Sequence, residues 1–107
     1  MFEPIKTSTY FLVMLVLRDG PRHGYEIAAS IKDRSQGYFS ISFGSLYPVL
    51  HKLEKDSLVE AQWQEAGDVK SKKVYKLTDK GSRQLTAELE QFNAMITAFK
   101  GFIGEGV

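Results

Sequence analysis

The sequence predicts a mainly α-helical domain with one small β-hairpin, followed by a long C-terminal helix. Three observations lead to this fold class. Apolar residues recur at helical spacing in four segments, residues 7–18, 24–34, 42–56 and 78–100. Between the third and fourth segments, residues 58–64 and 72–77 alternate apolar and polar side chains, as strands do. The last segment has apolar residues at heptad spacing along most of its length. A helix of this length is too long to pack fully against so small a domain.

The composition is typical of a globular protein and excludes several classes. The chain of 107 residues is enough for one core, and its contents of 43% hydrophobic and 25% charged residues are ordinary. With no cysteine it has no disulfide and no thiolate metal site, which fits a reducing compartment such as the cytoplasm. The longest apolar run, residues 10–17, is too short for a membrane span of about 20 residues. Nothing at the N-terminus resembles a signal peptide.

The first two helices are predicted over residues 7–18 and 24–34. Thr7 or Ser8 caps the first helix, whose middle, YFLVMLVL, is apolar on every side. Such a helix is buried on more than one side, and in a small domain a second subunit most easily covers the outer one, so we assign Phe11 and Leu15 to a dimer interface. The second helix buries Ile27, Ala28 and Ile31, and Gly37 follows it in a left-handed conformation. Residues 38–41 form a short β-type link.

The third helix, residues 42–56, has two different faces. Leu46, Val49, Leu50 and Leu53 form an apolar face, while the opposite face is small at its start and then polar or basic. The opposite face consists of Gly44, Ser45, Pro48, His51, Lys52 and Lys55. Because proline is comfortable only in a first turn, the helix begins either near Ser45, or near Ser42 with a distortion at Gly44; we favour Ser42.

A β-hairpin follows the third helix. Residues 58–64 and 72–77 alternate as strands, and residues 66–71 are predicted to be the turn. Trp63 is assigned to packing in the core or within the hairpin. Four lysines, at positions 70, 72, 73 and 76, lie within seven residues of the turn and the return strand.

The last helix is capped by Thr78, with Asp79 in its first turn. Its apolar positions are spaced by 4, 3, 4, 3 and 4 residues, which is the pattern of a coiled-coil seam. A second copy of the chain is therefore expected to pair with this seam, which comprises Leu85, Leu89, Phe92, Ile96, Phe99 and Ile103.

Three helices followed by a hairpin make a winged helix-turn-helix, in which the third helix enters the major groove of DNA. Residues 1–77 are then a DNA-binding domain and residues 78–107 a dimerisation helix. Lysines, hydroxyl groups and helix N-termini are the groups that meet phosphates. The predicted DNA contacts are Ser42, Ser45, Tyr47, His51, Lys52, Tyr25, Lys70, Lys72 and Lys73.

Four motifs in this order resemble the PadR family of bacterial winged-helix transcriptional regulators. They are HGYEI (23–27), GSLYPVLHKLEKDSLV (44–59), KKVYKLTDKG (72–81) and the C-terminal seam, and the resemblance covers roughly residues 7–100. It implies the short subfamily, which pairs through a single C-terminal helix, and a repressor. Many relatives carry arginines in the wing where this chain has lysines, and lysine cannot form a bidentate fork. The wing is therefore expected to contact the backbone of DNA.

Several side chains have two interpretations. Tyr47 can be half core and half phosphate contact, and His51 can be a donor to DNA or a solvated side chain. His23 is better explained by a structural hydrogen bond than by a phosphate contact. The wing lysines also protect an exposed strand from aggregation, which is compatible with binding phosphate. Phe92, Met95 and Phe99 are primarily interface residues, but the resemblance implies that a flat aromatic effector can bind among them.

The sequence therefore predicts a homodimeric, sequence-specific DNA-binding regulator that acts on a pseudo-palindromic operator. It contains no nucleophile elbow and no Gly-rich phosphate loop, so an enzyme is not expected, nor is a cofactor or metal. No membrane partner is expected. The rival is a winged-helix module whose outer face binds a partner protein.

Overall fold

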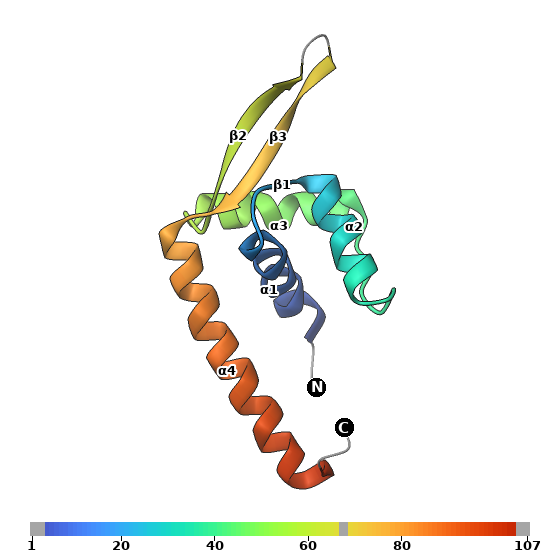
Figure 1. Ribbon diagram of the computed structural model, residues 1–107, viewed down its shortest axis with the longest axis vertical. Helices are drawn as coiled ribbons and strands as arrows, with labels where there is room; N and C mark the ends of the chain where they lie inside the picture. The colour runs from blue at the N-terminus through green and yellow to red at the C-terminus, as the bar shows by residue number, and fades with distance from the viewer. Residues whose placement is uncertain (1–3, 67–68, 105–107) are drawn as a thin grey trace.

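The computed structural model describes residues 4–66 and 69–104, and among them the side chains of residues 9–64 and 72–104. Within these ranges the chain forms four helices and a three-stranded sheet (Figure 1). The mainly helical winged helix-turn-helix predicted from the sequence is confirmed. The elements are α1 (Pro4–Arg18), β1 (Arg22–His23), α2 (Gly24–Arg34), α3 (Phe43–Lys55), β2 (Val59–Ala66), β3 (Val69–Leu77) and α4 (Asp79–Ile103).

The core lies where α1, α2 and α3 pack together under the base of the sheet. The apolar side of α3 supplies Leu46, Leu50 and Leu53, which are at most 2% exposed. Ile27 and Ile31 of α2 are buried beside them, as predicted. The other buried apolar residues are Val13, Met14, Val16, Leu17, Leu58, Val59, Tyr75 and Leu85.

The start of α1 differs from the prediction, whereas the favoured start of α3 does not. α1 begins at Pro4, three residues before Thr7, in keeping with the preference of proline for the first helical position. α3 begins at Phe43 with Ser42 as its N-cap, so the favoured start is confirmed. Gly37 has the predicted positive φ, of 80°, and its N–H bonds to the Lys32 carbonyl. Residues 38–41 form two bends and a link that pairs with no strand among the described residues.

The sheet is larger than the predicted hairpin. Its strand order is β1–β3–β2, with Arg22 opposite Tyr75 and His23 opposite Val74. A two-residue strand is too short to show alternation, so the sequence alone did not reveal β1. The predicted turn at residues 66–71 is also wrong, because Ala66 pairs with Val69 and both strands continue almost to the tip.

Two long projections leave the core in different directions: the hairpin β2–β3 (Val59–Leu77), hereafter the wing, and α4 (Figure 1). Thr78 caps α4 by accepting a hydrogen bond from the Gly81 N–H, as predicted. α4 continues to Ile103, beyond the predicted end, and has 25 residues, or about 37 Å at 1.5 Å per residue. Only its first turns pack in the core, so the molecule measures 56 × 29 × 25 Å.

Candidate nucleic-acid interface

The N-termini of α2 and α3 lie against each other at one side of the candidate interface. Gly24, the first residue of α2, is buried, and a Cβ atom there would lie 2.9 Å from Cε2 of Phe43. The glycine therefore lets the two helix N-termini approach closely. Tyr25 follows it and is 66% exposed, so its hydroxyl group is accessible beside the start of α3.

α3 is anchored by its leucines and leaves its opposite side open to solvent. The Ser42 hydroxyl accepts a hydrogen bond from the Ser45 N–H at 3.2 Å, which satisfies one of the free donors of the first turn. Pro48 lies inside the helix and has no N–H, so the Gly44 carbonyl lacks its usual donor four residues later. All six residues of the predicted outer face are exposed, and we call them the α3 outer face: Gly44, Ser45, Pro48, His51, Lys52 and Lys55.

Gly44 leaves a gap in that face. It lies in the first turn of α3, and a Cβ atom at this position would meet no other atom within 4 Å. Packing within the chain therefore does not explain the glycine. A residue without a side chain on an exposed helical face allows another backbone to come close.

The wing contacts α3 through an ion pair between Lys73 of β3 and Glu54 of α3. The distance from Lys73 Nζ to Glu54 Oε1 is 3.4 Å. Burial lowers the pKa of Lys73, but the electrostatic effects of the Tyr75 hydroxyl and of the Glu54 carboxylate outweigh it, so the pKa lies above its ordinary value. Lys73 is therefore cationic at neutral pH. Burial raises the pKa of the Tyr75 hydroxyl, so this side chain remains neutral.

Other lysines around the interface are paired with carboxylates. Lys52 Nζ lies 3.0 Å from Asp56, and Lys76 Nζ lies 3.2 Å from Glu60. These pairs are exposed and therefore weak, so phosphate groups can compete for the lysines. Among the described side chains, Lys55 and Lys72 have no carboxylate within 4.0 Å.

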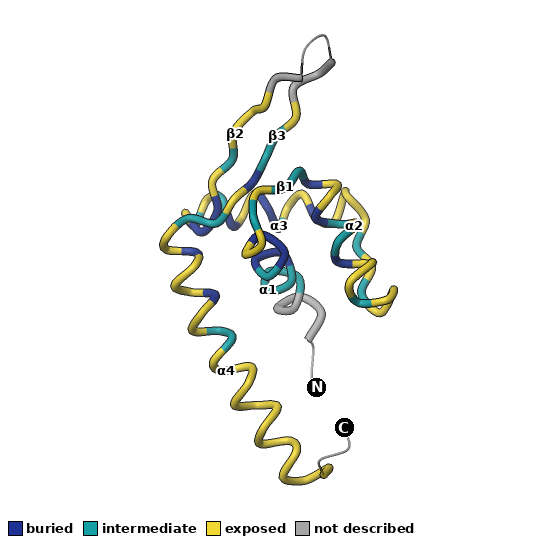
Figure 2. The backbone as a smooth tube through the Cα atoms, viewed as in Figure 1, coloured by how far each residue is buried: buried dark blue, intermediate teal, exposed yellow. Residues whose placement is uncertain are grey.

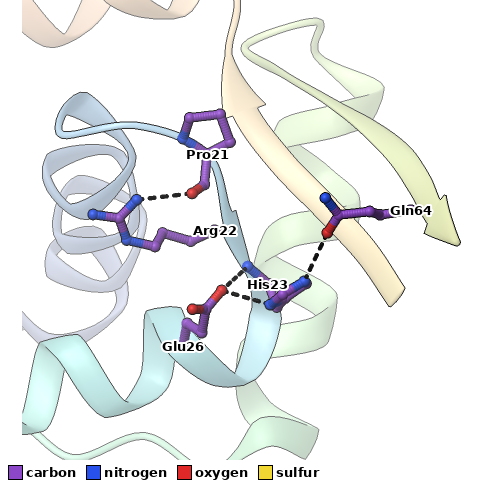
Figure 3. Close-up of polar contacts among 5 residues, drawn as sticks. All are labelled: Pro21, Arg22, His23, Glu26 and Gln64. Atoms are coloured by element: carbon purple, nitrogen blue, oxygen red, sulfur yellow. Dashed lines mark hydrogen bonds and ion pairs between the residues drawn. The ribbon is translucent and has the colours of Figure 1, made fainter. Parts of the chain in front are cut away.

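His23 connects the start of α2 with the wing (Figure 3). Its Nδ1 lies 2.6 Å from Glu26 Oε1, and its backbone N–H donates to the same oxygen at 2.8 Å. Its Nε2 lies 3.4 Å from Oε1 of Gln64 on β2. The prediction of a structural hydrogen bond is confirmed. The backbone N–H of His23 is the main reason that the pKa of Glu26 lies below its ordinary value.

Most of the predicted DNA contacts are exposed to solvent. Ser42, Ser45, His51, Lys52, Tyr25 and Lys72 are exposed, Tyr47 is 48% exposed, and Lys73 is half-buried against α3. The side chain of Lys70 lies outside the described side chains. Sequence reasoning missed Glu54, because nothing in the pattern showed that the wing turns toward α3. It also misplaced Trp63, which is 68% exposed rather than packed.

The part of α4 that is exposed and available to a second subunit is shorter than the predicted coiled-coil seam. Leu85 is 2% exposed in the core of its own subunit, and Leu89, Phe11 and Leu15 pack partly against that core. Leu85 is therefore not available to a partner, and its assignment to the interface is wrong. From Phe92 onward α4 is exposed (Figure 2). The exposed residues, which we call the α4 surface, are Phe92, Met95, Ile96, Phe99, Phe102 and Ile103.

The three residues proposed to hold an effector, Phe92, Met95 and Phe99, lie on the α4 surface. The rings of Phe92 and Phe11 are 5.5 Å apart, so α1 and α4 of one subunit meet at the start of this surface. Among the described side chains, no cluster of His, Asp and Glu could hold a metal ion. No described helix combines the length and the hydropathy that a membrane span requires.

Residues 13–87 match the model of the transcriptional regulator PadR-like family. The transcriptional regulator YqjI of Escherichia coli (strain K12) is 32% identical over 80 residues, which are 75% of this chain and 37% of YqjI. The negative transcriptional regulator PadR of Bacillus subtilis is 29% identical over 75 residues, which are 70% of this chain and 41% of PadR. This chain thus spans about two fifths of each of these two relatives.

Two solved structures show the same fold. The crystal structure of Bacillus subtilis PadR in complex with operator DNA has a TM-score of 0.69 and 29% identity, and the likeness covers 75% of this chain and 45% of PadR. A PadR-like transcription factor from Bacteroides fragilis has a TM-score of 0.74 and 27% identity, and the likeness covers 95% of this chain and 100% of that protein.

Proposed function

Because this chain belongs to the PadR-like family of transcriptional regulators, we propose that it represses transcription by binding operator DNA as a homodimer. The observation that carries the proposal is the α3 outer face, which is open to solvent, with the exposed Tyr25 at the start of α2 and with Lys73 of the wing paired to Glu54 of α3. The complex of Bacillus subtilis PadR with operator DNA supports it, because 75% of this chain is similar to that protein. The family consists of regulators and not of enzymes.

In this proposal α3 enters the major groove. Ser42, Ser45, Tyr47, His51 and Lys52 contact the bases or the phosphates at its edges. Tyr25 and the wing lysines, Lys70, Lys72 and Lys73, contact the backbone. The α3 outer face has neither arginine nor asparagine, which are the strongest base readers, so DNA shape carries much of the selectivity.

The α4 surface pairs with the same surface of a second subunit. Six apolar side chains that are between 37% and 90% exposed support this pairing, because a contiguous apolar patch marks an interaction site. A two-fold dimer requires a pseudo-palindromic operator whose half-sites lie about one helical turn, or roughly 34 Å, apart. Such a regulator acts in the cytoplasm, at the nucleoid.

A small aromatic effector is proposed to bind between the subunits at Phe92, Met95 and Phe99. The effector changes the angle between the two α4 helices, and the two α3 helices then no longer fit successive grooves. It can do so only by binding one dimer shape more tightly than the other. Crystal structures with and without the effector test this, and an unchanged separation of the α3 helices would refute the mechanism.

The DNA-binding proposal is tested by selecting bound DNA from a random pool, followed by titration of the selected DNA at several salt concentrations. A protein with several lysine–phosphate contacts loses affinity steeply with salt, with a logarithmic slope of about −0.9 per contact. The double substitution Lys72→Ala and Lys73→Ala should flatten the slope by almost 2 and weaken binding to all sequences alike.

The matched control replaces Lys32 and Lys100, two exposed lysines on α2 and α4 away from the α3 outer face. The double substitution Lys32→Ala and Lys100→Ala should leave the salt slope unchanged. If the unaltered protein showed no salt-sensitive binding to any DNA, the proposal would fail, and a winged-helix module that binds a partner protein would take its place.

A further inference from the structure

Trp63 is a large aromatic side chain that the fold leaves uncovered. It lies on β2, is 68% exposed, and is the only tryptophan of the 107 residues. A single exposed apolar side chain is common and by itself indicates nothing. The residues that surround Trp63 indicate a function for its exposed ring.

Trp63 lies on the face of the wing that turns toward α3. In the antiparallel register Trp63 pairs with Lys73, and Ala61 pairs with Tyr75, so these four side chains share one face. Lys73 Nζ is 6.0 Å from the centre of the Trp63 ring and also forms the ion pair with Glu54. Since Glu54 belongs to α3, the Trp63 face of the wing and α3 form the two sides of one corner.

The α3 side of this corner borders the α3 outer face. Tyr47 and Glu54 are seven residues apart, so two helical turns bring them to the same flank of α3. Tyr47 is 48% exposed there. A DNA duplex that occupies the α3 outer face therefore extends along this flank toward the wing, where Lys73 and the exposed ring of Trp63 lie.

We propose that Trp63 is a DNA contact of the wing, with its indole ring packed against the deoxyribose–phosphate backbone beside the groove that α3 enters. The inference rests on the proposed DNA-binding function and assigns to it an aromatic contact. The flat ring covers the apolar face of a sugar, and its Nε1–H can donate to a phosphate oxygen. Lys73 on the same face supplies a positive charge beside the ring, which favours DNA over an apolar protein partner.

The first test uses the fluorescence of Trp63, which reports on this position alone. Acrylamide quenching is measured for the free protein and for the protein saturated with the selected DNA, with saturation confirmed by the anisotropy of labelled DNA. Free Trp63 should be quenched readily because it is exposed. Bound DNA should reduce the quenching constant at least twofold. Complete binding with an unchanged quenching constant would overturn the inference and leave the proposed function intact.

The second test compares substitutions of the wing. Trp63→Ala should weaken DNA binding about tenfold, the effect expected of a buried aromatic contact, and Trp63→Phe should retain most of the affinity. The salt slope should stay unchanged in both, because tryptophan carries no charge and releases no counterion. Gln62→Ala is the matched control, since Gln62 is exposed on the opposite face of β2 and should bind as the unaltered protein does.

Thermal unfolding of each variant separates binding from folding. An exposed side chain contributes little to stability, so Trp63→Ala should unfold at nearly the same temperature as the unaltered protein. Equal DNA affinities of Trp63→Ala and Gln62→Ala would refute the role of Trp63 while the DNA-binding function stands. If the unaltered protein bound no DNA, the proposed function and this inference would both be wrong.

Discussion

At the scale of single residues, Gly44 is a position at which folding and the proposed DNA binding favour different side chains. The glycine lies in the first turn of α3 on the exposed side, where an added Cβ atom would meet nothing within 4 Å. Glycine is a poor helix former, so the fold alone would favour alanine at this position. The proposed close approach of DNA to the α3 outer face gives a reason for glycine.

Gly44→Ala should therefore stabilise the protein slightly, by up to about 1 kcal/mol, and at the same time weaken binding to the selected DNA. We expect a loss of about tenfold, comparable to the loss of one good base contact. Urea unfolding and DNA titration measure the two effects. Gly101→Ala in α4, where an added Cβ also meets nothing within 4 Å, should stabilise without affecting DNA affinity. Unchanged DNA affinity of Gly44→Ala would argue against close approach.

Glu26 makes the junction between β1 and α2 sensitive to acid. Its carboxylate accepts the His23 N–H at 2.8 Å, and this hydrogen bond is the largest cause of its lowered pKa. A group whose pKa is lowered by folding contributes stability at neutral pH and loses it as the pH falls through the folded-state pKa. The contribution is therefore complete at pH 7 and disappears in the acid range below about pH 4.

Glu26→Gln should lower the unfolding temperature at pH 7 by at most a few degrees, because the carboxylate is largely exposed. The difference from the unaltered protein should shrink as the pH is lowered below about 4. Thermal unfolding followed by circular dichroism between pH 3 and 7 checks this. A difference that is constant over this range would show that loss of the charge is not the cause.

At the scale of elements, Gly81 determines how α4 leaves the core. It is buried in the first turn of α4, and a Cβ atom there would collide with the backbone carbonyl of Leu58. The same Leu58 carbonyl accepts a hydrogen bond from the Thr78 N–H, and the Thr78 hydroxyl donates a hydrogen bond to the Ser57 carbonyl. These contacts fix the position of the α4 N-terminus against the start of β2, so they also set the direction in which α4 projects.

Gly81→Ala should destabilise the protein by about 1–3 kcal/mol, the usual cost of overpacking, although alanine is the better helix former. Urea unfolding measures the change. Gly101→Ala is again the matched control, because it makes the same replacement in the same helix where space is free. If both variants were stabilised, the close contact with Leu58 would not be a constraint.

At the scale of the whole molecule, the proposed function assigns the α4 surface and the α3 outer face to different partners. The wing and α4 project from the core in different directions (Figure 1), and in the proposed dimer this arrangement separates the second subunit from α3. The α4 surface begins where the core of the subunit ends, at Phe92. In the proposed dimer, the start of α4, which contacts Leu58, links the second subunit to the DNA-binding part of the chain.

Phe99→Glu should convert the dimer into a monomer, because it places a charge in the centre of the α4 surface. Affinity for a palindromic site should fall at least about 100-fold, while a single half-site is affected much less. Light scattering at micromolar concentration and DNA titration measure the two effects. Ala94→Glu, on the opposite side of α4, should remain a dimer. A monomeric unaltered protein would refute the palindromic operator.

The sequence predicted the class of each long element because its signals are local. The spacing of Leu46, Leu50 and Leu53 is enough to define both faces of α3, and Thr78 marks the start of α4 to the residue. Periodicity cannot reveal an element that is too short to show a repeat, or a contact between residues that are far apart in the sequence. The two-residue strand β1 exists only because His23 and Arg22 pair with β3, and no local signal marks it.

The sequence by itself determined the winged helix-turn-helix, the residues of the α3 outer face and the lysine content of the wing. The tertiary structure decided which apolar positions of α4 remain for a partner, since Leu85 is covered by the core of its own subunit. It also decided that the Trp63 face of the wing turns toward α3 through the Lys73–Glu54 ion pair. The physical reason is that periodicity specifies which side of an element is apolar, whereas the packing of distant elements determines which part of that side is covered.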